Sequence, residues 1–245
     1  MTARLLRDPI VRVALVVWAG IVALYFLPGV PADFLERLGD RYSTLPIWPW
    51  ASAACVYGLA SVRNREERRF WQLQAVSFAA LLAIELPWAL ARASHTPGWD
   101  ITAEWCYFVY YGCQLASAAQ TRKGAAGLIA ACVAAAAGLT AMALAHMAAY
   151  DSAWPSYLTY LVFDAAMLIV FLRRRRHAPP AWSAIFLGLA ITSAIVLVTD
   201  GLDMLWYENL LKIDSGMKTD IFWTLPPLAY VLVARFGRQR LETTT

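Results

Sequence analysis

The feature that most constrains this chain is the recurrence of apolar runs close to 20 residues long, separated by short segments that carry most of the arginines. A helical run of this length matches the hydrocarbon thickness of a bilayer. Because lipid offers no hydrogen-bond partner to the backbone, such runs cross it as helices. Hydrophobic residues make up 60% of the chain, and no separate soluble domain fits between the runs. We therefore predict an all-α, multispanning membrane protein with one domain over residues 1–245.

Eight transmembrane helices are expected, over residues 10–27, 45–62, 70–91, 101–119, 124–147, 154–172, 182–206 and 219–236. The first run is longer than the apolar core of a signal peptide, so we interpret it as a span. The fifth run is rich in alanine and glycine, which allows neighbouring helices to approach closely.

The basic residues indicate how this bundle is oriented. Sixteen of the 21 lysines and arginines fall on the side that holds both termini, and the other side holds Arg37, Arg41, Arg92, Lys212 and Lys218. Such asymmetry places the richer side in the cytoplasm. The net charge of +4 is then explained by topology, and we do not expect a nucleic-acid partner.

Acidic side chains within the predicted spans concentrate in the outward half of the membrane. They are Glu85, Glu104, Asp200, Asp203 and Asp220, with Asp164 closer to the middle. An ionised carboxylate that faces lipid is costly, so these groups are expected to face the bundle interior or a wet cavity, or to be protonated.

Two of the predicted helices repeat one spacing of acid and aromatic residues at i, i+3 and i+7, which is a single helix face. They hold Glu104, Tyr107 and Tyr111 in the fourth helix, and Asp200, Asp203 and Tyr207 in the seventh. Asp220 and Trp223 lie one turn apart in the eighth, and Tyr160 precedes Asp164 in the sixth. Together with Glu85, these side chains predict an outward-facing pocket for a small ligand.

Ordinary structural roles remain open for several of these residues. Tyrosine and tryptophan near helix ends form interfacial belts in many membrane proteins. Asp220 is placed to cap a helix N-terminus, where its charge is favoured. Asp203 is close enough in sequence to pair with Lys212 or Lys218.

The sequence contains few residue patterns that are typical of catalytic or cofactor-binding sites. The three histidines lack the spacing of metal ligands, and the four cysteines lie inside apolar runs, where they are expected to pack as small hydrophobic residues. Lys218 lies at the mouth of a span, which argues against a retinal Schiff base. We predict no metal and no cofactor.

Four segments resemble the multispanning sensory region that precedes bacterial diguanylate cyclases and some histidine kinases. They are EWCYFVYY (104–111), YLTYLVFDAAML (157–168), LVTDGLDMLWY (197–207) and DIFWTLPPLAYVLVARF (220–236). The resemblance covers residues 100–240, although Glu104 stands where that group has an aspartate. It implies a multi-pass protein of the bacterial inner membrane that signals through its last helix. The given sequence ends at RFGRQRLETTT without an output domain, so a separate cytoplasmic partner or a longer chain is expected to receive the signal.

Three hypotheses follow. The first is a sensor that binds a small molecule and transmits the change through Arg235–Leu241. The second is a proton- or cation-coupled transporter that uses Glu85, Asp164 and Asp200. The third is an intramembrane lipid-modifying enzyme, which lacks a recognisable nucleophile. Membrane lipids are the other expected partners, and the sequence leaves a homodimer open.

Overall fold

The computed structural model describes residues 3–41, 46–59, 62, 64–94, 99–119, 154–207 and 221–242, and these ranges are helical apart from short connections. The helices are α1 (Ala3–Leu6), α2 (Pro9–Leu24), α3 (Ala32–Arg41), α4 (Trp48–Leu59), α5 (Arg65–Ser94), α6 (Trp99–Ala119), α8 (Trp154–His177), α9 (Pro180–Tyr207) and α10 (Ile221–Glu242). The predicted all-α fold is confirmed across these ranges.

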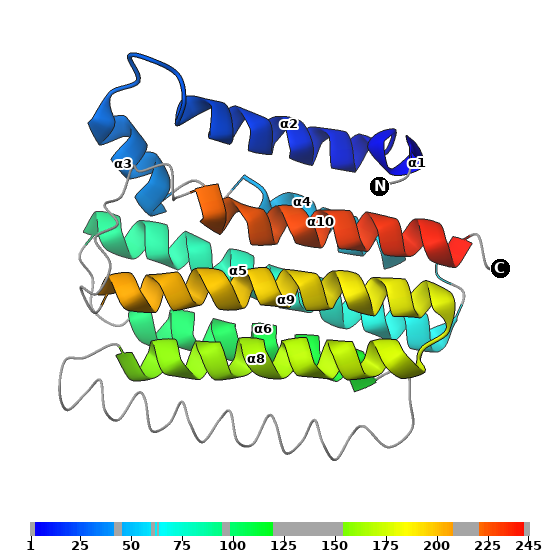
Figure 1. Cartoon of the computed structure of the whole chain (residues 1–245). Coiled ribbons are helices and arrows are strands. Elements are labelled where there is room, and N and C mark those ends of the chain that lie inside the picture. Colours follow the sequence, from blue (N-terminus) through cyan, green and yellow to red (C-terminus); the bar gives the residue numbers. More distant parts are fainter. Residues whose placement is uncertain are drawn as a thin grey trace.

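The long helices lie side by side, and the packed pairs α5–α6, α8–α9 and α9–α10 each run in opposite directions (Figure 1). α8 packs along α9, α5 along α6, and α10 against α9, α4 and α2. Both termini lie at one end of the bundle, together with the start of α5 and the end of α8. We call this the basic end, because the described arginines of those segments gather there: Arg4, Arg7, Arg12, Arg65, Arg68, Arg69, Arg173, Arg174, Arg175, Arg176, Arg235, Arg238 and Arg240. The opposite end is called the far end.

Helix starts at the basic end follow from local capping chemistry. The Asp8 carboxylate accepts hydrogen bonds from the backbone N–H groups of Ile10 and Val11 at 3.0 and 3.4 Å, and Pro9 occupies the first helical position of α2. Asn64 caps α5 in the same way, since its Oδ1 accepts from the Glu66 backbone N–H at 2.9 Å.

Several predicted boundaries need correction. Helix α3 lies where a loop was expected, because Leu35 and Leu38 form an apolar face that packs on the core. The arginine run Arg173–Arg176 follows the end of the span predicted over 154–172, but in the structure it continues α8 to His177. Helix α5 is also longer than predicted, beginning at Arg65 and ending at Ser94. The predicted span 124–147 lies outside the described residues.

The predicted eight-span bundle is not confirmed by the length and apolarity of the described helices. Within those ranges, one helix, Pro180–Leu205, is long and apolar enough to cross a membrane, and Pro9–Leu24 is a shorter apolar helix. Charged segments explain part of the shortfall: α5 opens with REERR, and α8 closes with RRRRH.

The distribution of polar and apolar side chains is informative about the surroundings of the bundle. Large apolar side chains are exposed on nearly every helix, among them Val16, Val56, Val76, Val109, Val162, Ile169, Ile191, Val198 and Phe222. Polar side chains are buried inside, among them Gln74, Ser77, Gln114, Ser117, Asp164, Thr192, Ser193 and Thr224. The same helices therefore carry apolar side chains on their outer faces and polar side chains in the interior.

Candidate functional site

Two carboxyl groups meet inside the bundle where α8 packs on α9. Asp164 of α8 is fully buried, with 0% of its surface exposed. Asp200 of α9 and the Tyr111 hydroxyl are its hydrogen-bonding neighbours, although in the described part of the chain neither carboxylate oxygen has a hydrogen bond of normal geometry. Two ionised carboxylates in an apolar interior repel one another, so this arrangement favours a shared proton or a bound cation.

A stack of aromatic rings adjoins the acid pair. The rings of Tyr107 and Tyr111 on α6 lie 4.8 and 6.3 Å from the ring of Tyr160 on α8, measured between centroids. Tyr111 also stacks on Phe163, with 4.5 Å between centroids and 9° between planes. The prediction that Tyr107 and Tyr111 share one helix face is therefore confirmed. Phe163 was not predicted, because an isolated phenylalanine in an apolar run carries no distinguishing signal.

Asp203 joins the ends of two helices rather than adding to the acid pair. Its Oδ2 accepts a hydrogen bond of 2.8 Å from the indole Nε1–H of Trp223. This bond connects the last turns of α9 to the first turn of α10. Both residues were predicted to belong to the site, and the structure brings them together at the far end. We call Tyr107, Tyr111, Tyr160, Asp164, Asp200, Asp203 and Trp223 the acid–aromatic cluster.

The remaining predicted site residues are not tested by the structure. Glu85, Glu104 and Tyr207 occur in α5, α6 and α9, but their side chains lie outside the described part, as does Asp220. Their assignment to the ligand pocket stays a prediction, and so does the pocket itself.

A buried polar network between α5 and α6 was not predicted from the sequence. Gln74 and Gln114 exchange hydrogen bonds of 2.9 and 3.0 Å between their side-chain amides. Gln74 also donates to the Ser117 hydroxyl at 2.8 Å, and Gln114 donates to the Ser77 hydroxyl at 3.0 Å. The sequence signal was available, since these residues repeat at helical spacing within apolar runs. The network is internally satisfied, so it stabilises helix pairing without requiring a ligand.

The Tyr110 and Tyr230 hydroxyl groups share a hydrogen bond of 2.5 Å and thereby connect α6 to α10. Tyr230 also borders a narrow void with Cys55, Gln74 and Leu189, and this void is too small to admit a water molecule. The polar groups of the bundle interior are therefore not joined there by a water-filled path.

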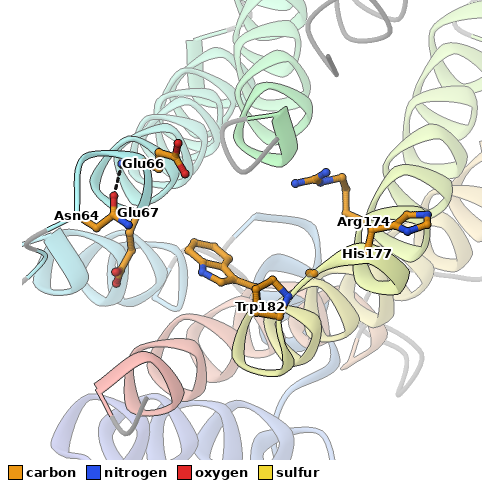
Figure 2. Close-up of a pocket in the computed structure, with 8 residues that line it drawn as sticks. Asn64, Glu66, Glu67, Arg174, His177 and Trp182 are labelled. Carbon is orange, nitrogen blue, oxygen red and sulfur yellow. Dashed lines mark hydrogen bonds between the residues drawn. The ribbon is translucent and has the colours of Figure 1, made fainter. Parts of the chain in front are cut away.

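A pocket of about 480 Å³ opens at the basic end, where α5 begins, α8 ends and α9 begins (Figure 2). The start of α5 supplies Glu66 and Glu67, and the end of α8 supplies Arg174 and His177. Trp182, in the first turn of α9, lies between these walls. The sequence did not predict this pocket, because its residues come from three separate helix ends.

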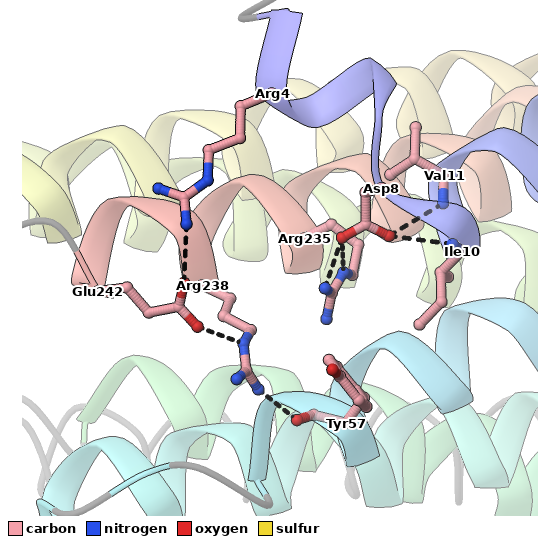
Figure 3. A network of polar contacts seen from close by, with 8 residues as sticks. All are labelled: Arg4, Asp8, Ile10, Val11, Tyr57, Arg235, Arg238 and Glu242. Atoms are coloured by element: carbon pink, nitrogen blue, oxygen red, sulfur yellow. Dashed lines mark hydrogen bonds and ion pairs between the residues drawn. The ribbon is translucent and has the colours of Figure 1, made fainter.

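A network of charged side chains also fastens the N-terminal helices to the end of α10 (Figure 3). Arg235 donates from Nε and Nη2 to Asp8 Oδ2, at 2.7 and 2.5 Å, and both side chains are buried. The Arg235 and Arg238 guanidinium groups lie over the Tyr57 ring of α4, at 4.6 and 4.8 Å from its centroid. Near the surface, Glu242 accepts from Arg238 at 2.7 Å.

Comparison with protein-family models, curated proteins and solved structures finds no match to this chain. The function is therefore argued from geometry.

Proposed function

We propose that the chain is a membrane-embedded sensor in which a small ligand binds at the acid–aromatic cluster and biases the packing of α10. The observation that carries this proposal is the environment of Asp164. A carboxyl group that is fully buried and lies beside a second carboxyl group, that of Asp200, is an expensive arrangement. Such groups within apolar bundles are typical of functional sites. Stacked tyrosines beside the acid pair would hold a cationic or hydrogen-bond-donating ligand.

Membrane embedding is part of the proposal. It is supported by apolar side chains that face outward on most helices and by polar side chains that are buried. It is also supported by the gathering of arginines at the end that holds both termini (Figure 1). We infer that the basic end faces the cytoplasm of a bacterial cell and that the ligand enters at the far end.

Helix α10 is suited to carry the signal because it is bonded near both of its ends. Trp223, in its first turn, donates to Asp203 of the acid–aromatic cluster, and Arg235, near its last turns, bonds Asp8. A ligand that binds more tightly to one arrangement of Asp203 and Trp223 shifts the population of α10 positions toward it. The receiver would be a cytoplasmic partner or an output domain, as the resemblance to bacterial sensory regions implies.

The test is a thermal-unfolding screen of purified protein against small cations, amines and neutral hydrogen-bond donors. A compound that binds the native state raises the unfolding temperature in proportion to its occupancy. We expect the best compound to stabilise the parent and Glu242→Gln, whose change lies at the basic end, but to lose most of its effect on Asp164→Asn and Asp200→Asn. Equal shifts in all four proteins would move the ligand site away from the cluster.

A second candidate function is a proton- or cation-coupled transporter. The specific observation that favours it is the Asp164–Asp200 pair, which is suited to bind and release one proton or one monovalent cation. Against it, the void next to Gln74 and Tyr230 does not admit water. Uptake of the stabilising compound into proteoliposomes under an imposed proton or sodium gradient would support transport, whereas binding without accumulation would support the sensor.

A further inference from the structure

The pocket at the basic end places opposite charges on opposite walls. The Glu66 and Glu67 carboxylates belong to the first turn of α5, and Arg174 belongs to the last turns of α8 (Figure 2). The Arg174 side chain extends across the opening from the α8 wall, and the Trp182 indole lies between the two walls. A ligand that fills this pocket meets carboxylates on one side and a guanidinium group on the other.

Ring contacts hold Arg174 and Trp182 in place. The Arg174 guanidinium lies over the Phe186 ring, with Cζ 5.6 Å from the centroid. Trp182 packs edge-on against Phe70 at 4.9 Å between centroids. Partial burial raises the pKa of the Glu67 carboxyl above its ordinary value, and the Arg238 guanidinium offsets this only in part. A cation bound next to Glu67 would favour its charged form.

The position of the pocket along the helices narrows the ligand class. The apolar part of α8 ends at Leu172, four arginines follow, and the apolar part of α9 begins just after Pro180. The pocket lies at this change from apolar to basic surface. In a membrane-embedded bundle that is the depth of lipid headgroups, where tryptophan is also enriched.

We propose that this pocket binds a zwitterionic phosphate ester that carries a primary ammonium group. The phosphate would bond Arg174, whose planar guanidinium matches two phosphate oxygens, with His177 beside it. The ammonium would lie between the α5 carboxylates and the Trp182 indole, where hydrogen bonding and cation–π attraction act together. A volume of about 480 Å³ suits a group of this size.

This chemistry has two sources, an ethanolamine phospholipid of the surrounding membrane and a water-soluble glycerophosphoethanolamine. Two related phospholipid headgroups are expected to bind the pocket less tightly. A phosphoglycerol headgroup lacks the ammonium, and a choline headgroup has a quaternary ammonium that cannot donate hydrogen bonds to Glu66 and Glu67. The site lies near the start of α9, whereas Asp200 and Asp203 lie near its end, roughly 30 Å away along the helix. Failure of this proposal would therefore leave the proposed sensor function untouched.

The experiment uses the full chain in detergent micelles and measures binding of two probes. The soluble probe is glycerophosphoethanolamine, followed by calorimetry. The lipid probes are phosphatidylethanolamine, phosphatidylcholine and phosphatidylglycerol, added singly and followed by native mass spectrometry. The variants are Arg174→Gln and the pair Glu66→Gln with Glu67→Gln. The matched control is Arg173→Gln, which removes the same charge from an exposed neighbour that does not line the pocket.

We expect the ethanolamine probes to bind more tightly than the choline and glycerol lipids. Arg174→Gln and the double glutamine variant should weaken that binding about tenfold or more, while Arg173→Gln changes it little. Binding of the lipid alone identifies a membrane source, and binding of the soluble probe alone identifies an aqueous one. The proposal is overturned if Arg174→Gln and Arg173→Gln behave alike, if the double glutamine variant binds as the parent does, or if phosphatidylglycerol matches phosphatidylethanolamine. Circular dichroism of each variant establishes that it is folded.

Discussion

Asp8 has two structural roles at once. Its Oδ1 caps α2 through the backbone N–H groups of Ile10 and Val11, and its Oδ2 accepts two hydrogen bonds from the Arg235 guanidinium. Because Asp8 and Arg235 are only 7% and 6% exposed, each charge depends on the other for the solvation that water would otherwise provide. Removing one partner therefore leaves an uncompensated buried charge.

Asp8→Asn is expected to lower the free energy of unfolding by about 3–5 kcal/mol. Asparagine retains the capping oxygen, so the loss reports the ion pair and not the cap. The measurement is unfolding by sodium dodecyl sulfate in mixed micelles, followed by circular dichroism. Glu242→Gln is the control, since the Glu242 side chain is 42% exposed and its pair with Arg238 is worth less than about 1 kcal/mol. Similar losses in the two variants would contradict a strong role for the buried pair.

Residue-level prediction from sequence succeeded where chemistry follows local spacing. Tyr107 and Tyr111 share a face because they are four residues apart on one helix, and the structure brings both to Tyr160. The Asp8–Arg235 pair could not be found in this way, because 227 residues separate its members and the pattern alone does not say which helices are neighbours. Arg235 was predicted to transmit the signal at the end of the last helix, and the structure shows that it is buried in its pair with Asp8.

At the scale of elements, α9 and α10 approach closely through small residues on facing surfaces. A Cβ atom added at Gly188 would lie 2.7 Å from Val233 Cγ2, and one added at Gly237 would lie 2.9 Å from Ile185 Cγ1. Both contacts are far shorter than normal van der Waals distances. The branched valine and isoleucine side chains have little rotamer freedom to move aside, so the spacing of the two helices is fixed by these glycines.

Gly188→Ala is expected to destabilise the protein by about 1–3 kcal/mol, because the methyl group must push α9 away from α10. Adding Val233→Ala should restore part of the loss, since it removes the two methyl groups that clash. Gly112→Ala in α6 is the matched control, because no heavy atom lies within 4 Å of its added Cβ. Thermal unfolding of the four proteins compares them directly. Equal effects at Gly188 and Gly112 would show that the helices are not held at this spacing.

Most helices were found from the sequence because each apolar run is long enough to be recognised by itself. The boundaries were less well predicted, for reasons that lie in other helices. Arginine has a high helix propensity, so Arg173–Arg176 continue α8 once packing against α9 supports it. Helix α3 was not predicted, because only apolar runs long enough to span a membrane were interpreted as helices and its Leu35 and Leu38 face is short. The residues that line the pocket at the basic end form no recognisable pattern in the linear sequence.

At the scale of the whole molecule, two independent features support the proposed membrane embedding. Polar side chains such as Gln74, Gln114 and Asp164 are buried, while apolar ones such as Val16 and Ile191 face outward. The arginines meanwhile gather at the end that holds both termini. Length and hydropathy mark one helix in the described part of the chain, Pro180–Leu205, as span-like. The arrangement of the side chains therefore carries more information than the average composition of each helix.

Reporter fusions in a bacterial cell test this arrangement. A green fluorescent protein joined after Glu242 should fluoresce, since the basic end is proposed to be cytoplasmic. Alkaline phosphatase is active only when it folds outside the cytoplasm. Joined after Gly29, which follows α2 at the far end, it should therefore be active. Phosphatase joined after Ala178, between α8 and α9, should be inactive, since that connection lies at the basic end. Exchanging Arg173–Arg176 for glutamine should raise the activity of the last fusion if the arginines fix the orientation. Recovery of the unfused chain in the soluble fraction after alkaline carbonate extraction would overturn membrane embedding, and with it the proposed direction of ligand entry.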